Sequence, residues 1–366
     1  MAGQFSEAGR LSVLPHLCAR FDAVGRKLAF KAEALEEWRK WRTALRRKLK
    51  ELTGYATMQA APLEPKVTER VEAGEFVRER VEIRTEPGVI MPLYVIRLKE
   101  LEGRRLPAVI CAHGHGSGGK LMTAGRADIP EIAEAIKQYN GDYGLQFARA
   151  GFVTFCPDAR GFGERREAAT PDPMKYSCEW INHMALPLGQ TVTGMWAWDL
   201  SRLIDYIETC EDCLRGGVGC AGLSGGGLQT LWLSALDKRV RCAVVSGYLY
   251  GYRESLLVMH TNCSCNYLPR LYEYADMGDI AALIAPRPLL VETGSADHLN
   301  GAGGLKNVRP QVAAARRAYR LLGAQKALKH DIFDGPHTWH GVRAVPWMQR
   351  WMGRDAGEVY GDVRSR

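Results

Sequence analysis

A run of glycines around one serine constrains this chain more than any other feature of its sequence. The segment Gly222-Leu-Ser-Gly-Gly-Gly227 follows an apolar run, residues 218–221, and precedes a stretch with helical period, residues 228–236. This order predicts a tight strand-to-helix turn that holds Ser224. The spacing Gly-x-Ser-x-Gly is typical of a turn whose serine hydroxyl stands clear of the sheet, because its glycines prevent a collision between strand and helix. Such turns can also be purely structural, so a catalytic role for Ser224 depends on suitable partner residues elsewhere in the chain.

Length and composition limit the class of protein. The chain has 366 residues, of which 46% are apolar and 25% charged, and this is ordinary for one large α/β domain or two average domains. No apolar run is long enough to span a membrane. Pro15 and His16 interrupt the apolar stretch 11–17, so the first twenty residues lack the continuous apolar core of a signal peptide. We therefore expect a cytoplasmic protein without a membrane span.

The cysteines favour a reducing compartment. Several fall in apolar runs, where free cysteine behaves as a small hydrophobe: Cys111, Cys156, Cys220 and Cys242. Two closer pairs, Cys210-x-x-Cys213 and Cys263-x-Cys265, could hold a metal or react as redox thiols. Neither has a second pair at zinc-finger spacing or a nearby histidine pattern, so we expect no metal and no cofactor.

Most of the formal net charge of +8 lies near the start of the chain. Residues 26–50 contain ten lysines or arginines and three glutamates, a net charge of +7. Apolar residues recur there at steps of three and four and predict an amphipathic helix that ends near Gly54: Leu35, Trp38, Trp41, Leu45, Leu49 and Leu52. We expect the stripe to pack on the main domain or on a second subunit, and the charges to face water without a nucleic-acid partner. A lipid or nucleic-acid contact is the alternative.

The remaining chain shows two different patterns of apolar residues. Residues 67–98 alternate with period two around Glu86-Pro87-Gly88, which predicts antiparallel strands joined by a turn. Beyond them, apolar strands alternate with helix-length segments: strands near 108–112, 152–156, 218–221, 242–245 and 289–291, and helices near 143–150, 192–209, 226–236, 270–284 and 308–322. This alternation predicts a mostly parallel sheet flanked by helices.

Two stretches do not fit the alternation. Residues 163–191 and 247–269 are expected to cross the carboxyl edge of the sheet, where ligands bind in open α/β sheets. They are the candidate walls of a substrate pocket. Their aromatic and histidine residues are candidate lining residues, although such residues are as often packing: Trp180, His183, Tyr248, Tyr250 and Tyr252.

A serine needs a base to remove its proton and a carboxylate to orient that base. In this type of fold the chain order is serine, acid, histidine. The strand 288–293 ends in Gly294-Ser-Ala-Asp297, and the strand-like run 328–333 ends in Asp334-Gly-Pro-His337. Ser224, Asp297 and His337 therefore come in the expected order, each after its own strand. They are our candidate catalytic residues.

Other residues compete for these roles. His340 could be the base, but the tight turn before His337 positions that ring better. His298 directly follows Asp297 and is expected to point away from it. Glu292, inside a strand, and Asp334, in the histidine loop, are weaker candidates for the acid.

An oxyanion formed during attack on a carbonyl needs N–H donors, each contributing on the order of 3 kcal/mol. The residue after the nucleophile, Gly225, should supply one backbone donor. The strand 107–112 runs into the glycine-rich loop His113-Gly-His-Gly116, from which we choose the N–H of His115. A flexible loop or a phosphate cradle is the alternative, but the chain has no nucleotide-binding motif at this place.

Several motifs together resemble a known family. In order they are Cys111-Ala-His-Gly-His-Gly, Asp158-Ala-Arg-Gly-Phe-Gly-Glu164, Gly222-Leu-Ser-Gly-Gly, Ala285-Pro-Arg-Pro-Leu-Leu, Gly294-Ser-Ala-Asp297 and Gly335-Pro-His337. Over residues 67–353 the chain resembles α/β-hydrolases of the acetyl xylan esterase and dienelactone hydrolase-like group. The resemblance implies the α/β-hydrolase fold with an eight-stranded sheet, and hydrolysis of carboxylic esters of small molecules without metal or cofactor.

The same resemblance assigns the nucleophile to Ser224, the acid to Asp297, the base to His337, and the oxyanion donors to Gly225 and His115. It implies a structural ion pair for Arg160. We expect a helical extension over residues 1–66 and a catalytic domain over 67–366. A peptidase or amidase of the prolyl-oligopeptidase type, and a binding protein without catalysis, are the alternative functions.

Overall fold

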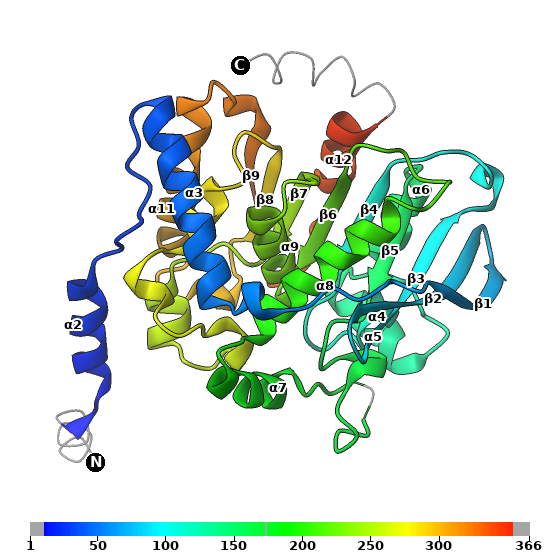
Figure 1. The fold of residues 1–366 in the computed structure, drawn as a ribbon, viewed down its shortest axis with the longest axis horizontal. Helices are drawn as coiled ribbons and strands as arrows, with labels where there is room; N and C mark the ends of the chain where they lie inside the picture. Colours follow the sequence, from blue (N-terminus) through cyan, green and yellow to red (C-terminus); the bar gives the residue numbers. More distant parts are fainter. Residues whose placement is uncertain (1–10, 173, 354–366) are drawn as a thin grey trace.

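A nine-stranded sheet forms the centre of the molecule (Figure 1). The computed structural model describes residues 11–172 and 174–353. The strands are β1 (Lys66–Ala73), β2 (Phe76–Glu86), β3 (Val89–Leu98), β4 (Ala108–Ala112), β5 (Val153–Pro157), β6 (Val218–Leu223), β7 (Val240–Ser246), β8 (Leu289–Gly294) and β9 (Leu328–Phe333). Their order across the sheet is β1-β2-β3-β5-β4-β6-β7-β8-β9.

The sheet has an antiparallel part and a parallel part. Strands β1, β2 and β3 pair antiparallel, and β3 pairs antiparallel with β5. From β5 onward every pair is parallel. The implied number of eight strands is therefore wrong for the described residues. The region 67–98 forms three strands because the chain also reverses at Gly74, whose φ of 61° suits glycine.

Helices cover both faces of the sheet. They are α2 (Leu14–Val24), α3 (Leu35–Leu52), α4 (Lys120–Thr123), α5 (Pro130–Tyr139), α6 (Tyr143–Arg149), α7 (Cys178–Ala185), α8 (Val192–Ile207), α9 (Gly225–Leu236), α10 (Met277–Ala282), α11 (Leu305–Leu321) and α12 (Ala344–Met352). Successive residues of a strand face opposite sides. Gly219 in β6 lies against Met348 of α12, whereas the next residue, Cys220, contacts Thr230 of α9. Helices α9 and α12 therefore pack on opposite faces.

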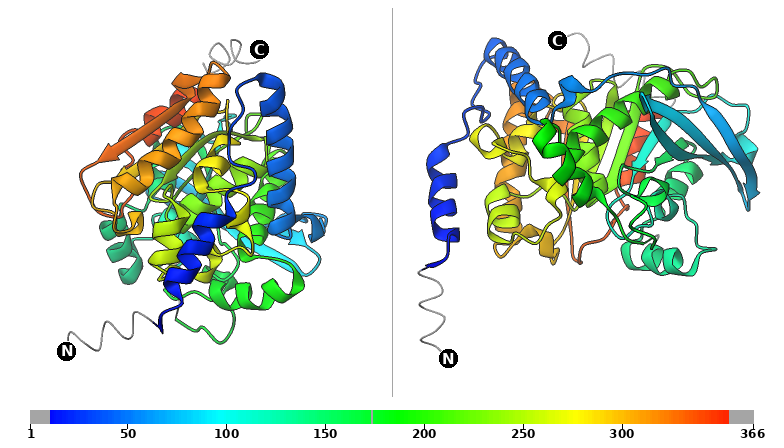
Figure 2. Two further views of the ribbon diagram at one scale, coloured as in Figure 1. Left: turned by 90° about the vertical axis from the view of Figure 1, so that its left-hand side faces the viewer. Right: turned by 60° about the horizontal axis from the view of Figure 1, so that its bottom comes forward.

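The amphipathic helix near the start of the chain forms as α3 and packs beside α9 (Figures 1 and 2). Trp38, Leu45 and Leu49 are buried, whereas Leu35, in the first turn, is exposed. Not every basic side chain faces only water, because Arg46 donates to the Ala235 carbonyl oxygen at 3.0 Å. No helix of the described ranges is both long and apolar enough to cross a bilayer.

One predicted helix differs in length from the observed helix. The helix expected over residues 270–284 is shorter, because Asp276 and Asp279 form a capping box that begins α10 at Met277. Parts of the predicted extension (residues 1–10), insertion (residue 173) and catalytic domain (residues 354–366) lie outside the described residues.

Candidate active site

Ser224 lies on a strained turn between β6 and α9. Its φ of 59° and ψ of −119° are unfavourable for a residue with a side chain. A Cβ on Gly222 would lie 2.7 Å from the Ala112 carbonyl oxygen, and one on Gly226 would overlap that same oxygen. Glycine is required at both positions because strand and helix nearly touch there. The Ser224 N–H donates to the Ser246 carbonyl oxygen at 3.0 Å and ties the turn to β7.

Asp297 and His337 meet beyond the ends of β8 and β9. His337 Nδ1 lies 2.8 Å from Oδ2 of Asp297, a hydrogen bond to a buried carboxylate. The other carboxylate oxygen accepts the Leu299 N–H at 2.8 Å. Two backbone bonds hold the loops together: Ser295 N–H donates to the Phe333 carbonyl oxygen at 2.8 Å, and Ala296 N–H to that of Gly335 at 2.9 Å. The aspartate thus orients the imidazole with Nδ1 toward the carboxylate.

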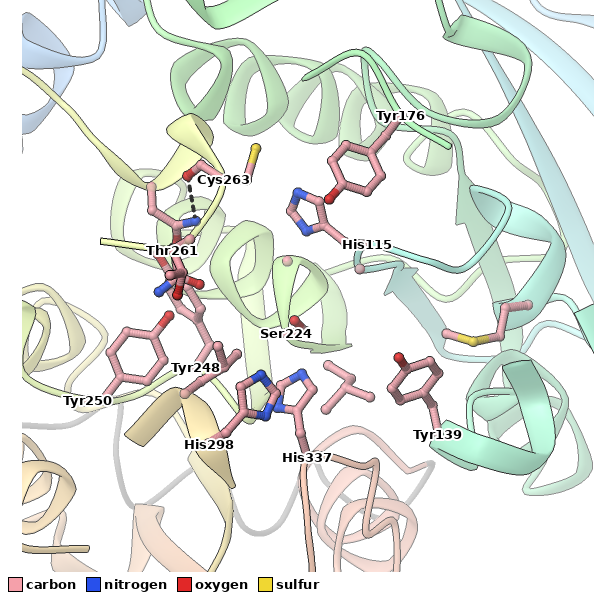
Figure 3. Close-up of a pocket in the computed structure, with 17 residues that line it drawn as sticks. His115, Tyr139, Tyr176, Ser224, Tyr248, Tyr250, Thr261, Cys263, His298 and His337 are labelled. Carbon is pink, nitrogen blue, oxygen red and sulfur yellow. Dashed lines mark hydrogen bonds between the residues drawn. The ribbon is translucent and has the colours of Figure 1, made fainter. Parts of the chain in front are cut away.

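The His337 ring faces the same cavity as Ser224 (Figure 3). A Cβ on Gly247 would lie 2.9 Å from His337 Cε1, so this glycine lets the ring pack against the end of β7. Among the described residues, no hydrogen bond joins the Ser224 hydroxyl to His337. Catalytic hydrogen bonds are often long in ligand-free enzymes and shorten when substrate binds. The structure therefore brings Ser224 and His337 to one cavity and joins buried Asp297 to His337 by a hydrogen bond.

The loop after β4 lies against the serine turn. A Cβ on Gly114 would lie 2.8 Å from the Leu223 carbonyl oxygen and 3.2 Å from Ser224 Cβ. His113 anchors this loop, because its Nε2 accepts the Ala159 N–H at 3.1 Å and its Nδ1 lies 3.0 Å from the Gly114 carbonyl oxygen. Burial lowers the pKa of His113, which favours the neutral ring that these bonds need. Neither the His115 N–H nor the Gly225 N–H has a hydrogen-bond partner within the described ranges.

The cavity has a volume of about 260 Å³. Its walls come from the β4 loop, α4, α5, the two insertions and the segments after β6, β8 and β9: Gly114, His115, Met122, Tyr139, Tyr176, Leu223, Ser224, Gly225, Tyr248, Tyr250, Thr261, Asn262, Cys263, Asn266, His298, Leu299 and His337. Burial raises the pKa of Tyr248 and of Tyr250, so both present neutral hydroxyls. Tyr248 donates to Asn266 Oδ1 at 2.8 Å.

Only some of the residues predicted to line the pocket do so. Tyr248 and Tyr250 line the cavity, but Trp180, His183 and Tyr252 are not among its lining residues. Trp180 and His183 lie on α7, whose buried face is formed by Cys178, Asn182 and Ala185. Residues two and five positions after Cys178 project from the other side of that helix. Tyr252 is buried and its ring packs near that of Tyr272.

The sequence reasoning missed Tyr139, Tyr176, Asn262 and Cys263 as lining residues. Three of them belong to the insertions that were predicted as pocket walls, whereas Tyr139 ends α5, which was not predicted. His298 was expected to point away from Asp297. Instead it lines the cavity, with Nδ1 at 4.0 Å from Oδ1 of Asp297 and its ring 5.6 Å from that of His337.

The alternative base, His340, is bonded to a different carboxylate. Its Nδ1 lies 2.8 Å from Oδ2 of Asp331, and its ring stacks on Phe333 with centroids 4.4 Å apart. Glu292, the weaker candidate acid, is buried and accepts the Gly341 N–H at 3.1 Å. Neither His340 nor Glu292 lines the cavity that contains Ser224.

This arrangement is characteristic of one class of protein. A serine on a Gly-x-Ser-x-Gly turn at the carboxyl edge of a mostly parallel sheet, with an aspartate and a histidine on later loops, defines an α/β-hydrolase. The chain belongs to the Abhydrolase family, whose model matches residues 18–302. The matched residues include Ser224 and Asp297 and end before His337.

Known proteins resemble the chain at two levels. YtaP of Bacillus subtilis (strain 168), provisionally named a hydrolase, is 27% identical over 272 residues, which cover 71% of this chain and 83% of YtaP. A Bacteroides fragilis NCTC 9343 protein, provisionally described as an acetyl xylan esterase, has 18% identity and a TM-score of 0.76 over 93% of this chain and 94% of its own. A CE15 glucuronoyl esterase from Teredinibacter turnerae T7901 has 16% identity and a TM-score of 0.63 over 90% of each chain. These two structural likenesses establish the fold.

Proposed function

We propose that this chain is a serine esterase that cleaves carboxylic esters through an acyl-enzyme intermediate. The observation that carries the proposal is the His337 ring, which faces the cavity of Ser224 while its Nδ1 is hydrogen-bonded to buried Asp297. In this mechanism His337 Nε2 takes the proton from the Ser224 hydroxyl, whose oxygen attacks the ester carbonyl. The Gly225 and His115 N–H groups stabilise the oxyanion.

His337 gives this proton to the leaving alcohol, which completes acylation of Ser224. In the second half of the reaction His337 takes a proton from the water molecule that attacks the acyl-serine, and returns it to the Ser224 oxygen as the acid leaves. Asp297 keeps the imidazole in the required tautomer and stabilises its charged form. The N–H groups of Gly225 and His115 have no hydrogen-bond partner within residues 11–172 and 174–353, and a Cβ on Gly225 would lie 3.0 Å from His115 Nδ1. Two unpaired N–H groups on spatially adjacent residues beside Ser224 support their assignment as oxyanion donors.

The substrate class we propose is a short acyl ester, such as an acetyl ester, of a carbohydrate. A cavity of about 260 Å³ that tyrosine hydroxyls and histidine rings line is suited to a small polar ester. The similar folds described as acetyl xylan and glucuronoyl esterases support a carbohydrate as the alcohol or acid part. Activity on a panel of acetylated sugars, uronic acid esters, aryl esters and lactones would order these candidates.

The decisive experiment is Ser224→Ala, assayed with p-nitrophenyl acetate. We expect hydrolysis to fall by about 10⁶-fold, because removal of a serine nucleophile has effects of that size. Ser295→Ala is the matched control, since Ser295 is exposed and its hydroxyl donates to Asp334. A fluorophosphonate probe should label wild type and the control, and leave Ser224→Ala unlabelled.

Two results would contradict the proposal. Full hydrolysis by Ser224→Ala would remove this serine from the reaction. Equal kcat/KM values for an ester and its matched amide would favour a peptidase or amidase instead, because an esterase has no provision for an amine leaving group.

A further inference from the structure

Four metal-binding side chains form a cluster of which two members, His115 and Cys263, line the cavity on the side across from His298 and His337 (Figure 3). The other two, Cys178 and Cys265, are buried. His115 comes from the loop after β4, Cys178 begins α7, and Cys263 and Cys265 lie at the short 3₁₀ helix Ser264–Asn266. Their donor atoms all lie within 4.8 Å of one another. Three segments far apart in the sequence therefore place three sulfurs and one imidazole nitrogen at one point.

The distances between the donor atoms fit a tetrahedral ion. Cys178 Sγ lies 3.5 Å and Cys265 Sγ 3.8 Å from His115 Nε2, and the Cys178 and Cys263 sulfurs are 3.3 Å apart. Zinc with bonds of about 2.3 Å to sulfur and 2.0 Å to nitrogen separates two sulfur ligands by about 3.8 Å, and a sulfur from a nitrogen ligand by about 3.5 Å, in a tetrahedral site. The sulfur pair is also well beyond the roughly 2.05 Å of a disulfide bond.

From this geometry we infer that His115, Cys178, Cys263 and Cys265 form a structural zinc site. Three thiolates and one imidazole are a soft donor set typical of closed, four-coordinate zinc sites. Binding would release the remaining thiol protons to water, leaving three thiolates on one divalent cation. This inference stands apart from the proposed esterase activity, and it revises the expectation from sequence that the chain holds no metal.

The surroundings hold the four side chains in place. Asn182 Nδ2 donates to the Ser264 carbonyl oxygen at 2.9 Å and joins α7 to the segment of Cys263 and Cys265. Asn266 Nδ2 lies 3.5 Å from Cys265 Sγ and 3.1 Å from the Cys263 carbonyl oxygen. Such N–H groups next to a thiolate are common around metal ligands, where they orient the sulfur and support its charge.

The imidazole is equally constrained. The rings of Phe162 and Tyr176 pack edge-on against His115, with centroids at 5.1 and 4.6 Å. Gly161, next to Phe162, has a φ of 86°, and a Cβ there would lie 2.5 Å from the Cys178 N atom. Glycine at this position lets the loop after β5 approach α7, so the aromatic clamp and the first cysteine share one support.

The composition of the cluster also suits a cation. Its donors are three thiols and one imidazole, in a partly buried place, with no lysine or arginine among the four. The second group of possible ligands, Glu292, Asp331 and His340, differs because Arg343 already pairs with Asp331 at 2.7 Å.

The bound ion would fasten the wall of the cavity. It would connect the loop that holds the His115 N–H to both insertions, which are otherwise joined by a few hydrogen bonds. The ligand is the ring of His115, whereas the proposed oxyanion donor is its backbone N–H. The two roles are compatible, and ligation would fix the position of that N–H.

The test is the metal content of the reduced, full-length chain, purified without chelators and measured by inductively coupled plasma mass spectrometry. We expect one zinc per chain in wild type and less than about a tenth of that in Cys263→Ser and Cys265→Ser, because each loses a thiolate ligand. Cys210→Ser is the matched control and should keep its zinc, since Cys210 lies outside the cluster. Circular dichroism checks that each variant is folded.

A second measurement needs no variant. Metal-stripped wild type titrated with Co²⁺ should develop the intense visible bands of tetrahedral cobalt and the ultraviolet absorption of thiolate-to-cobalt charge transfer, at one ion per chain. Three results would overturn the inference: no zinc or cobalt bound more tightly than about 1 µM, equal zinc loss in Cys210→Ser and Cys263→Ser, or a Cys178–Cys263 disulfide in the native, metal-free chain. These readouts do not depend on hydrolysis.

Discussion

Two aspartate–histidine pairs lie near the same end of the sheet, and their surroundings differ. Asp297 binds His337, and Asp331, in β9, binds His340, both through Nδ1 at 2.8 Å. The His337 ring faces the cavity with Ser224, whereas the His340 ring stacks on Phe333. Asp331 also pairs with Arg343, while the second oxygen of Asp297 accepts a backbone N–H.

The difference shows that a hydrogen bond to a buried carboxylate is not enough to make a histidine a base. The ring also needs a nucleophile and a substrate space at its other nitrogen. The guanidinium of Arg343 further offsets the charge that Asp331 would otherwise direct at its histidine. Under the proposed mechanism the first pair is catalytic and the second is structural. Substitutions in each pair test that division.

His337→Ala should lower kcat/KM for p-nitrophenyl acetate by about 10⁴- to 10⁶-fold, because the serine then has no base. His340→Ala is the matched control and should stay within about threefold of wild type, since it leaves the cavity intact. Steady-state kinetics on both purified variants measures the contrast. Similar losses in the two variants would break the distinction between the pairs.

Asp297→Asn should lower kcat by about 10⁴-fold with little change in KM, because the amide no longer fixes the tautomer of His337 or stabilises its charge. Asp331→Asn should leave kcat within about threefold. It should cost about 1–3 kcal/mol of unfolding free energy, since the hydrogen bonds of His340 and Arg343 to the buried carboxylate would then be made to an amide. Kinetics and urea unfolding on each variant separate the roles, and a normal kcat in Asp297→Asn would argue against them.

Glu292, near the second pair, should make stability depend on pH. Burial raises the pKa of this carboxyl to about 7, so the folded chain retains its proton at a pH where the unfolded chain has lost it. The contribution of Glu292 to the free energy of unfolding is therefore most favourable below about pH 4.5. It is lost as the pH rises toward 7, and the free energy of unfolding falls by at most about 3 kcal/mol.

The urea midpoint of Glu292→Gln, relative to that of wild type, should consequently be higher at pH 8 than at pH 5. Glu211→Gln, at an exposed position, serves as the control and should follow wild type at both values. An unchanged difference between Glu292→Gln and wild type across this range would mean that the carboxyl is already ionised at pH 5.

Phe333→Leu should have the smallest effect. It removes the stacking of Phe333 on His340, worth about 0.5–1.5 kcal/mol beyond burial, and retains an apolar side chain. Thermal unfolding should register the loss, and kcat should be unchanged. A fall in kcat greater than about tenfold would show that the second pair influences the first.

Most of the parallel sheet could be predicted from the sequence, and so could the positions of Ser224, Asp297 and His337 after their strands, because these features depend on local patterns. Apolar runs of strand length and the glycine spacing around Ser224 are visible in a single sequence, and the chain order of Asp297 and His337 follows from the strands. Arg160, expected to form a structural ion pair, does so with Asp199 at 2.8 Å and Glu86 at 2.7 Å.

The cavity wall could not be predicted to the same degree. Which side of α7 faces inward depends on tertiary packing, so Trp180 and His183 were assigned to the pocket although both are exposed. The cluster of His115 and three cysteines depends on contacts between segments separated by up to 150 positions. The spacing Cys263-x-Cys265 alone gave no reason to expect Cys178 beside it.

The distribution of the site along the chain affects when activity can arise during synthesis. Ser224 follows β6 in the middle of the sequence, Asp297 follows β8, and His337 follows β9, the edge strand that pairs last in sequence order. Under the proposed mechanism, a nascent chain that has emerged only as far as β8 presents an alcohol and a carboxylate but no imidazole. Unfinished chains would therefore be inert toward esters, and hydrolysis would report that the final edge of the sheet has formed.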